Sequence, residues 1–472
     1  MIQDQEEFRD QEEYRDHLST LDASGRRVWI YPKKPKGWYT DMRTYVSWIL
    51  LAILFGLPFI KYNGEPLVLF NVIERHFIVF GINFTPQDMH LAALAMITLM
   101  LFIVLFTVVF GRLFCGWVCP QTIFMEMVFR KIEYWIEGDY TRQIKLNKAP
   151  WTAEKWIKKI GKHAIFFTIA VVIANTFLSY IIGVDEVMKI ISEPVSMHMG
   201  GFIAMLIFSG LFYYIFAFFR EQVCTNVCPY GRLQGVLLVK DSIVVAYDWI
   251  RGEPRGKKRR KEADNMPQLG DCIDCHLCVK VCPTGIDIRN GTQLECVNCT
   301  ACMDACDEVM LKIGRDPGLI RYDSLTGIEK GIRKIFTPRV WAYSAVLLVL
   351  ILFQSFLLVN RSDVETLILR TPGMLFQTEE DGRISNLYNY QIINKTRENY
   401  TDLSFGLVDQ NGEIQTVGDV PDLKANEVLE GAFFIKIPKD ELEGRKTRLK
   451  IHVFQGDDLL DEAKTTFLGP NQ

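Results

Sequence analysis

Hydrophobic positions along the chain are gathered into five long blocks that carry almost no charge. The blocks cover residues 45–60, 91–110, 164–183, 201–219 and 340–359. Each is close to the length that crosses a bilayer as a helix. The first block is short and contains Pro58 near its end, so its boundary is the least sharply defined. The pattern predicts five membrane-spanning helices.

Beyond residue 360 the pattern changes to short segments that often alternate between apolar and polar residues. The segments cover residues 366–369, 384–394, 403–408, 432–437 and 448–454, and Asn411-Gly412 is a hairpin signal. Regularly spaced short strands predict an antiparallel sandwich. No catalytic constellation stands out in it, and His452 is expected to be an ordinary strand residue. The segment is interpreted as a binding module outside the membrane.

Lysine and arginine predict how the spans are oriented. They are concentrated before the first block and between residues 111 and 163, and the acidic first 22 residues hold no apolar signal segment. The positive-inside rule places the amino terminus, the loop at residues 111–163 and the cysteine-rich segment in the cytoplasm, with the carboxyl-terminal segment outside. The basic run at 255–261 is assigned to anionic lipid, and no nucleic-acid partner is expected.

Cysteine spacing supplies the chemistry. All twelve cysteines precede residue 307, and eight of them form two C-x-x-C-x-x-C-x-x-x-C runs. Three thiolates at this spacing converge on one 4Fe-4S cluster, and in two-cluster ferredoxins the fourth ligand comes from the other run. The expected ligands are therefore Cys272, Cys275, Cys278 and Cys306 for one cluster, and Cys282, Cys296, Cys299 and Cys302 for the other.

Two alternatives to iron-sulfur clusters fit these runs less well. Zinc sites favour cysteine pairs at wider separation, and thiols on a reducing face of the membrane do not oxidise to disulfides. Pro283 follows the first run as the ferredoxin pattern requires, whereas Asp307 stands where the second proline is expected. This departure changes the turn after the last ligand and leaves the ligand set intact.

An internal repeat relates the second and fourth spans. Both copies read P-x-x-M-H, then an apolar span, then R-x-x-(x)-C-x-x-x-C-P. The first copy runs from Pro86 to Pro120 and the second from Pro194 to Pro229, with Arg112 matched to Arg220. Two helical hairpins in one orientation indicate a parallel duplication about an axis normal to the membrane.

The repeated C-x-x-x-C-P motif is the candidate catalytic and copper-binding site. Four residues apart on a helix, two sulfurs lie on one face, too far apart for a disulfide and suited to one soft metal. Soft thiolates select Cu(I), zinc or iron-sulfur centres. Structural cysteines at helix ends stopped by proline are the alternative. The repeat predicts a shared site of Cys115, Cys119, Cys224 and Cys228.

The P-x-x-M-H motif carries a weaker metal signal. Histidine and methionine are ligands for copper or haem, but proline also commonly starts a helix. The candidate ligands are Met89, His90, Met197 and His198. A span of 25 residues separates His90 from Cys115, or roughly 37 Å of helix. Electrons from the ferredoxin segment therefore reach the cysteines more readily than the outer histidines.

Together these features resemble the FixG/RdxA/CcoG family of cytochrome c oxidase accessory proteins over nearly the whole chain. The cysteine-rich half alone is also similar to NapH-type and NosR-type polyferredoxins, and the carboxyl-terminal sandwich favours the first family. The resemblance implies a bacterial inner-membrane protein that reduces Cu(II) to Cu(I) during assembly of a cbb-type oxidase. It implies that the four membrane cysteines and the eight ferredoxin cysteines serve as its metal sites.

The expected architecture is a multidomain membrane protein. It comprises a cytoplasmic tail (1–43), a duplicated four-helix membrane domain (44–240), a two-cluster ferredoxin insert (241–338), a fifth span (339–360) and a periplasmic immunoglobulin-like sandwich (361–472). Expected partners are the membrane, a cytoplasmic electron donor, a copper transporter or chaperone, oxidase assembly factors and a second copy of the chain. Two other functions remain open, namely a quinol-linked electron conduit and a copper-binding assembly scaffold.

Overall fold

The computed structural model describes residues 26–470 apart from 63, 74–75, 85–87, 257–268, 333, 374, 397, 409, 419 and 426. Three features of the sequence therefore lie wholly or partly outside the described residues. They are the acidic start of the chain, Pro86 of the first P-x-x-M-H motif, and the basic run from residue 257 onward.

The described residues fold as two compact units. The first unit combines the chain up to Leu69 with Ala95–Ile351, and the second combines Phe70–Leu94 with Leu352 onward. The membrane helices and the ferredoxin insert thus belong largely to one unit. The loop between the first two spans belongs to the second unit from Phe70 onward.

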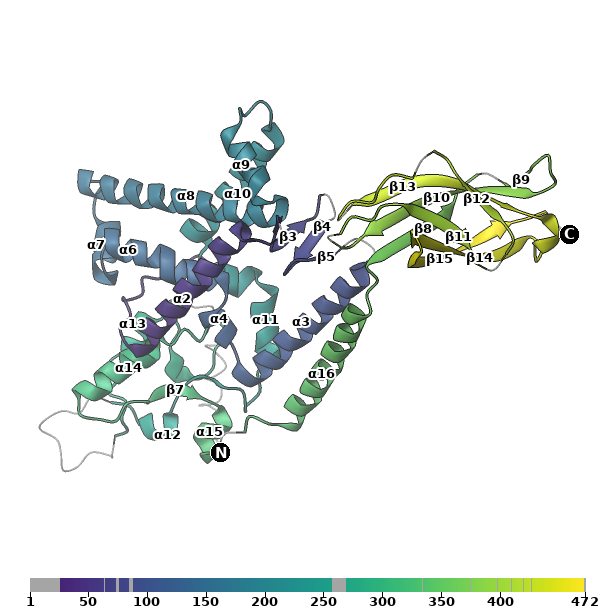
Figure 1. Cartoon of the computed structure of the whole chain (residues 1–472). Coiled ribbons are helices and arrows are strands. Elements are labelled where there is room, and N and C mark those ends of the chain that lie inside the picture. The colour runs from purple at the N-terminus through teal and green to yellow at the C-terminus, as the bar shows by residue number, and fades with distance from the viewer. Residues whose placement is uncertain are drawn as a thin grey trace, which may run out of the picture. The chain divides into compact units, whose positions relative to one another are not determined.

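Among the described residues five helices are long and apolar enough to cross a membrane, as the hydrophobic blocks predict. They are α2 (Trp38–Gly56, continued by a 3-10 turn at Leu57–Phe59), α3 (Met89–Phe110), α8 (Ala153–Ile182), α10 (Met199–Tyr214, continued by a π-helical turn at Ile215–Phe219) and α16 (Pro338–Val359) (Figure 1). Each ends within a few residues of its hydrophobic block, but α2 and α8 start well before theirs.

Helix α8 starts early because its charged first turns are satisfied locally. The Thr152 hydroxyl caps the helix by accepting the N–H of Lys155 at 3.3 Å. The buried Lys155 ammonium donates to the carbonyls of Asn147 and Ala149 at 2.9 and 2.6 Å. A lysine whose charge is bonded in this way continues the helix although it falls outside the apolar block.

Short elements connect the spans of the first unit. After α3 come α4 (Leu113–Trp117), α5 (Pro120–Ile123), a π-helical turn (Phe124–Phe129), α6 (Arg130–Ile136) and α7 (Tyr140–Lys148). After α8 comes α9 (Val184–Ser192), and after α10 come a π-helical turn (Val223–Val227) and α11 (Pro229–Leu237). The ferredoxin insert contains β6 (Val244–Tyr247), α12 (Trp249–Gly252), α13 (Leu277–Val281), a 3-10 turn (Ile288–Asn290), α14 (Ala301–Lys312), β7 (Ile320–Asp323) and α15 (Leu325–Lys330), with β6 paired antiparallel to β7.

The repeat is present, but its register differs from the sequence alignment. The helix breaks at Gly111 in the first copy and at Arg220 in the second, where φ is 54° and 52°. Each break lies four residues before the first cysteine of its motif. Matching Arg112 to Arg220 was therefore wrong, because the position that turns the chain is Gly111 in one copy and Arg220 in the other. Glycine adopts this left-handed conformation freely, whereas arginine needs fixed partners to hold it.

The helix start predicted at Pro194 is also wrong. Helix α9 ends at Ser192, and Pro194 begins a turn in which its carbonyl accepts the N–H of Met197 at 2.9 Å. Helix α10 begins only at Met199, with His198 as the preceding cap residue. Proline at the first turn of a helix and proline at the start of a β-turn share the same fixed φ, so the motif does not distinguish them.

The carboxyl-terminal domain of the second unit is the predicted antiparallel sandwich. One sheet has the order β12-β13-β10-β8 with β9 also on β10, and the other has the order β11-β14-β15. The strands are β8 (Val364–Arg370), β9 (Gln377–Thr378), β10 (Ile384–Asn394), β11 (Leu403–Leu407), β12 (Glu413–Thr416), β13 (Val428–Ile437), β14 (Lys446–Gln455) and β15 (Asp458–Leu468). The residues between the sheets include the fully buried Tyr388, Phe433, Ile451 and Phe467.

One turn in this domain was assigned wrongly. Asn411-Gly412 links β11 to β12, and these strands lie in different sheets rather than in one hairpin. The tight hairpin is instead β14–β15, where Gly456 has φ 56° between Gln455 and Asp458. His452 is the ordinary strand residue that was expected, on β14 and 3.2 Å from Glu462.

The loop between the first two spans belongs to the first unit up to Leu69 and to the second unit from Phe70 onward. It contains a hairpin of β1 (Lys61–Tyr62) with β2 (Glu65–Pro66) and a sheet of β3 (Val68–Asn71), β4 (His76–Val79) and β5 (Ile82–Phe84). Asp88 lies at the end of this loop and is buried. Its carboxylate accepts from Arg361 at 2.7 Å and from Lys395 at 2.9 Å. These two ion pairs fasten the loop to the sandwich.

Candidate iron-sulfur and thiolate sites

The two ferredoxin runs fold into the same backbone turn. In each run the residues on either side of the second cysteine adopt left-handed φ angles. These are Asp274 (53°) and His276 (55°) in the first run, and Asn298 (52°) and Thr300 (65°) in the second. Left-handed residues reverse the chain tightly, so successive cysteines turn inward. Asn and Asp tolerate this conformation better than most residues. Their position directly before the second cysteine of each run is therefore a local signal of the turn, in addition to the cysteine spacing.

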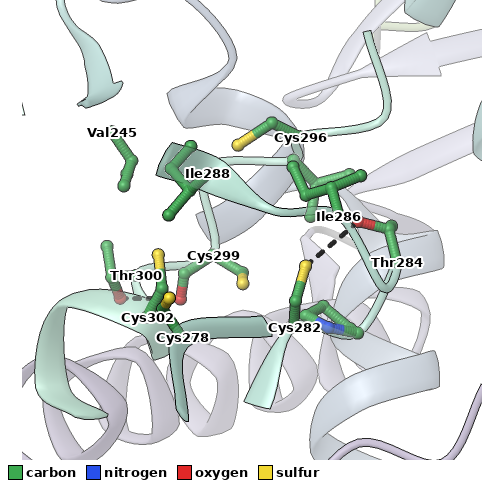
Figure 2. Close-up of a pocket in the computed structure, with 12 residues that line it drawn as sticks. Val245, Cys278, Cys282, Thr284, Ile286, Ile288, Cys296, Cys299, Thr300 and Cys302 are labelled. Carbon is green, nitrogen blue, oxygen red and sulfur yellow. Dashed lines mark hydrogen bonds between the residues drawn. The ribbon is translucent and has the colours of Figure 1, made fainter. Parts of the chain in front are cut away.

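Each run continues into a helix that carries its last cysteines. Cys278 lies in α13 and Cys282 caps its end, while Cys302 and Cys306 both lie in α14. One cavity is lined by Cys272, Cys275, Cys278 and Cys306. A second is lined by Cys282, Cys296, Cys299 and Cys302, with Cys278 also on its wall (Figure 2). The first cavity thus receives Cys306 from the second run, and the second cavity receives Cys282 from the first run together with Cys278, which lies on both walls.

The donor set of the two cavities fits iron-sulfur clusters. Burial raises the pKa of Cys296 to about 11 and that of Cys278 and Cys299 to about 12. A cationic centre is needed to hold such thiols as thiolates at neutral pH. The thiols that line each cavity come from both runs, and four thiols are the donor set of a 4Fe-4S cluster.

The wall of the second cavity would also stabilise bound thiolates and exclude water. The Cys282 sulfur is 3.3 Å from the Thr284 hydroxyl and accepts backbone N–H groups from residues 284–286. Amide donors around a cluster sulfur tune its reduction potential. Apolar side chains close the rest of the wall, and they include Val245, Ile286 and Ile288.

The cysteines of the C-x-x-x-C-P motifs do not lie on one helix face. Cys115 lies in α4, but Cys119 is the cap residue before α5. Cys224 likewise lies in a π-helical turn, and Cys228 caps α11. The assumption of a continuous helix was wrong, because the proline after each second cysteine starts a new helix rather than ending the old one.

The two pairs nonetheless lie within electrostatic range of one another. Burial raises the pKa of Cys224 to about 12, and the nearby Cys119, Cys115 and Cys228 raise it further. Burial also raises the pKa of Cys115 to about 11. Both amide atoms of the fully buried Gln234 lie 3.3–3.4 Å from the Cys115 sulfur. The repeat thus brings four thiols and one amide into a single neighbourhood.

This neighbourhood adjoins the second cluster cavity. Gly116 packs so closely on the loop between Cys296 and Cys299 that a Cβ there would lie 2.5 Å from the Asn298 carbonyl oxygen. Cys115 packs against the buried group that contains Val281, Val297 and Cys299. The requirement for glycine at residue 116 therefore comes from the ferredoxin loop and not from a turn.

The ferredoxin insert is also anchored to the first span. The Asp304 carboxylate, between two cysteines of α14, accepts the backbone N–H of Tyr39 at 3.0 Å and of Thr40 at 2.8 Å. These are free N–H groups at the start of α2, so Asp304 caps that helix from a distant part of the chain. In Figure 1 the start of α2 meets α14. This cap explains why α2 begins at Trp38, before its hydrophobic block.

The methionine-histidine pairs are placed differently from the cysteines. Met89 and His90 begin α3 in the second unit, whereas Met197 and His198 precede α10 in the first. His198 forms a 2.6 Å contact with Glu193. Helix α3 has 22 residues, which separates its two ends by about 33 Å. Within the described residues no group of three cysteine, histidine or acidic side chains that could hold one metal ion is found, either at these pairs or at the four C-x-x-x-C-P cysteines.

A buried charge network beside the π-helical turns was not anticipated from the sequence. Glu133 on α6 binds the guanidinium of Arg220 and, at 3.3 Å, the ammonium of Lys162. The Arg220 side chain also stacks on Trp29, 4.5 Å from the ring centre. These contacts hold Arg220 in its left-handed conformation. The sequence does contain one signal for this network. Arg220 directly follows an apolar block, and a charge buried there requires a partner.

Replacing Glu133 should destabilise the first unit. Burial alone favours the neutral carboxyl, but Arg220 outweighs it and lowers the pKa of Glu133 to about 2. The stability from this carboxylate is therefore complete above its ordinary pKa and is lost as pH falls toward 2. At pH 7 Glu133→Gln should cost about 3–5 kcal/mol, as for other broken buried ion pairs. Thermal unfolding in detergent should show this, with little change for the exposed Glu154→Gln. Equal effects of the two variants would contradict the assignment.

Comparison with known families agrees with this geometry. A family described as a 4Fe-4S dicluster domain matches residues 219–325, a 4Fe-4S binding domain matches 92–141, and the IG-like fold at the C-terminus of FixG matches 355–470. Both C-x-x-x-C-P motifs fall inside the iron-sulfur matches. Together with the five apolar helices, these matches define a membrane-bound iron-sulfur protein of electron transfer.

Three curated relatives place the chain more closely. The nitrogen fixation protein FixG of Rhizobium meliloti is 32% identical over 80% of this chain and 78% of its own length. Protein RdxB of Cereibacter sphaeroides is 32% identical over 92% and 94%. The ferredoxin-type protein NapH of Escherichia coli is 22% identical over 59% and 91%. The chain belongs to the FixG family.

Proposed function

We propose that this protein transfers electrons one at a time from two 4Fe-4S clusters to Cu(II), and that the Cu(I) formed serves the assembly of a cbb-type cytochrome c oxidase. The observation that carries the electron path is the contact between Gly116 and the loop that holds Cys296 and Cys299. This contact places the second cavity directly beside the C-x-x-x-C-P cysteines, with no other helix or strand between them. The copper and oxidase parts rest on the chemistry of those thiols and on the family.

Each residue group has a distinct role in this path. When bound, a 4Fe-4S cluster supplies one-electron transfer, which matches an acceptor that takes one electron. The crossed cysteine sets hold two such groups in adjoining cavities, because Cys278 lies on both walls. Apolar side chains exclude water from each cavity. Cys115, Cys119, Cys224 and Cys228 bind the copper substrate, and Cu(II) becomes Cu(I) by gaining one electron.

The proposed orientation places the ferredoxin insert in the cytoplasm and the sandwich in the periplasm. Lysines and arginines favour it, since residues 111–163 are rich in both. Several of them are bonded at the start of α8, where Lys159 and Lys162 pair with Glu137 at 2.8 and 2.9 Å. An electron donor in the cytoplasm would then reach the exposed Cys275 side of the first cavity.

Inner-membrane vesicles of opposite orientation test the function and the orientation together. Dithionite, which does not cross the bilayer, should bleach the cluster absorbance only in inside-out vesicles. After its removal, added Cu(II) should restore that absorbance, and a Cu(I)-specific chelator should detect one Cu(I) for each electron lost. Vesicles lacking the protein are the control. Bleaching only in right-side-out vesicles would contradict the orientation, and reduced clusters unaffected by Cu(II) would contradict copper reduction.

A quinol-linked conduit is the second candidate, and an apolar groove favours it. The groove has a volume of about 670 Å³ and lies between α2 and the segment from Met127 to Trp135. Its wall includes Trp48, Lys131 and Ser47, and the Ser47 hydroxyl donates to the carbonyl of Arg43 one turn away. Oxidation of the reduced clusters by a soluble quinone, with no oxidation by Cu(II), would favour this candidate.

A further inference from the structure

We infer that Arg43 and Arg112 give the cluster held in the second cavity the higher reduction potential of the two. Electrons that enter at the first cavity are thereby drawn to the second, beside Cys115. This inference rests on the proposed presence of both clusters. It adds a direction of flow and the residues that set it.

Arg43 reaches the second cavity from the first span. Its side chain is 5% exposed, and its Nε donates to the carbonyl of Gly116 at 2.6 Å. Gly116 itself rests on the Asn298 carbonyl, which places the guanidinium within electrostatic range of Cys299. Among the described residues Nη2 of Arg43 has no hydrogen-bond partner and no carboxylate pairs with it. Its positive charge is therefore buried and uncompensated beside the cavity.

Arg112 supplies a second positive charge on the same side. In the part of the chain that the structure describes, its guanidinium donates only to backbone carbonyls, those of Gly231 at 2.8 Å, Cys296 at 3.4 Å and Leu294. Glu295 also lies beside Cys296, within electrostatic range of Arg112. Two guanidinium groups against this one carboxyl group leave the second cavity electropositive on the side that faces the membrane helices.

Acidic groups lie behind the wall of the first cavity, next to residues that line it. Arg289 lines it, but that guanidinium is bound by Asp287 at 2.6 Å and by Asp274 at 2.5 Å. Asp307 follows Cys306 directly and accepts the N–H of Gly318 at 2.7 Å. This is the position where the ferredoxin pattern has proline. The one departure from that pattern thus places a carboxyl group beside the first cavity.

The sign of the effect follows from charge. Reduction adds one negative charge to a cluster, so nearby cations stabilise the reduced form and nearby anions destabilise it. The effect is strong where the charges are buried and poorly screened. Arg43 and Arg112 therefore raise the potential of the second cluster, and Asp307 and Asp287 lower that of the first.

The test is a redox titration of the full-length protein followed by paramagnetic resonance. Arg43→Gln should shift only the second cluster to a more negative potential, and Arg43→Lys should restore most of that shift. Asp307→Asn, which keeps an acceptor for Gly318, should shift only the first cluster to a more positive potential. Arg448→Gln, on an exposed strand of the sandwich, is the matched control. Each paramagnetic resonance signal is assigned to its cluster by its loss in Cys282→Ser, for the second cluster, or in Cys306→Ser, for the first.

Two results would overturn the inference while leaving the clusters in place. One is a wild-type protein in which the first cluster has the higher potential. The other is an unchanged second potential in Arg43→Gln and Arg112→Gln, both with full iron content. Absence of two cluster signals in the wild-type protein would instead remove the proposed function on which the inference rests. If the reduction potentials shift as expected but the protein does not reduce Cu(II), copper is not the electron acceptor, and the direction of electron flow between the clusters is supported.

Discussion

Replacing either cysteine pair of the C-x-x-x-C-P motifs should be nearly as damaging as replacing both. Cys115→Ser/Cys119→Ser and Cys224→Ser/Cys228→Ser should each lower the rate of Cu(II) reduction by at least the roughly 10- to 100-fold that loss of a supporting residue costs a metal site. The reason is that all four thiols share one neighbourhood, and Cys224 lies within electrostatic range of the other three. Ligands that act as a unit have strongly non-additive effects.

The measurement is the Cu(II) reduction rate and the bound Cu(I) of both double variants and the quadruple variant. Ser192→Ala/Ser196→Ala, two hydroxyls outside the cysteine motifs, is a matched control for a double substitution. If each double variant lost half of the bound Cu(I) and of the reduction rate, and the quadruple variant lost the sum, the cysteines would form two independent sites. Loss of iron from the quadruple variant, with both ferredoxin signals intact, would mean that the four cysteines hold another iron-sulfur group and not copper.

Cys282→Ser should damage the second cluster, and Cys306→Ser should damage the first. Each of these residues is the last cysteine of its own run but lines the cavity of the other run. Two intact 4Fe-4S clusters contain about eight irons, so each variant should retain about four. Iron analysis gives the count, and paramagnetic resonance shows which signal is lost.

The same variants can reject the crossed ligand sets. If Cys282→Ser removes the signal that Cys272→Ser also removes, each run holds its own cluster. Cys282→Ser and Cys296→Ser should instead remove the same signal, and Cys306→Ser and Cys272→Ser the other. Thr284→Val, which removes only the hydroxyl near the Cys282 sulfur, is a mild control that should keep both clusters.

The sequence predicts well what local patterns encode. The five spans follow from blocks of apolar residues, and the sandwich follows from alternating strands. The C-x-x-x-C-P motif shows where this stops. Spacing alone predicts Cys115 and Cys119 on one helix, whereas α4 ends at Trp117 and Pro120 starts a new helix directly after Cys119. A proline that is compatible with both arrangements cannot decide between them.

Contacts between distant residues account for most of what the sequence did not predict. Arg43 bonds to Gly116 across 73 positions, and Glu133 bonds to Arg220 across 87. No local periodicity encodes such pairs, because each partner reads only as an isolated charge near the end of a span. Asp307 was noticed as a departure from the ferredoxin pattern, but its effect depends on a cavity that only the fold reveals.

The cap that Asp304 places on the first span has a consequence for the order of synthesis. Tyr39 leaves the ribosome 265 residues before the carboxylate that accepts its N–H. At about 5–20 residues per second this interval lasts roughly 13–53 s. During that time four spans, including α2 itself, are translated while the start of α2 lacks the Asp304 carboxylate that caps it. The first span therefore receives its cap only after the cysteine-rich segment has been translated and folded, so the membrane unit is completed late in synthesis.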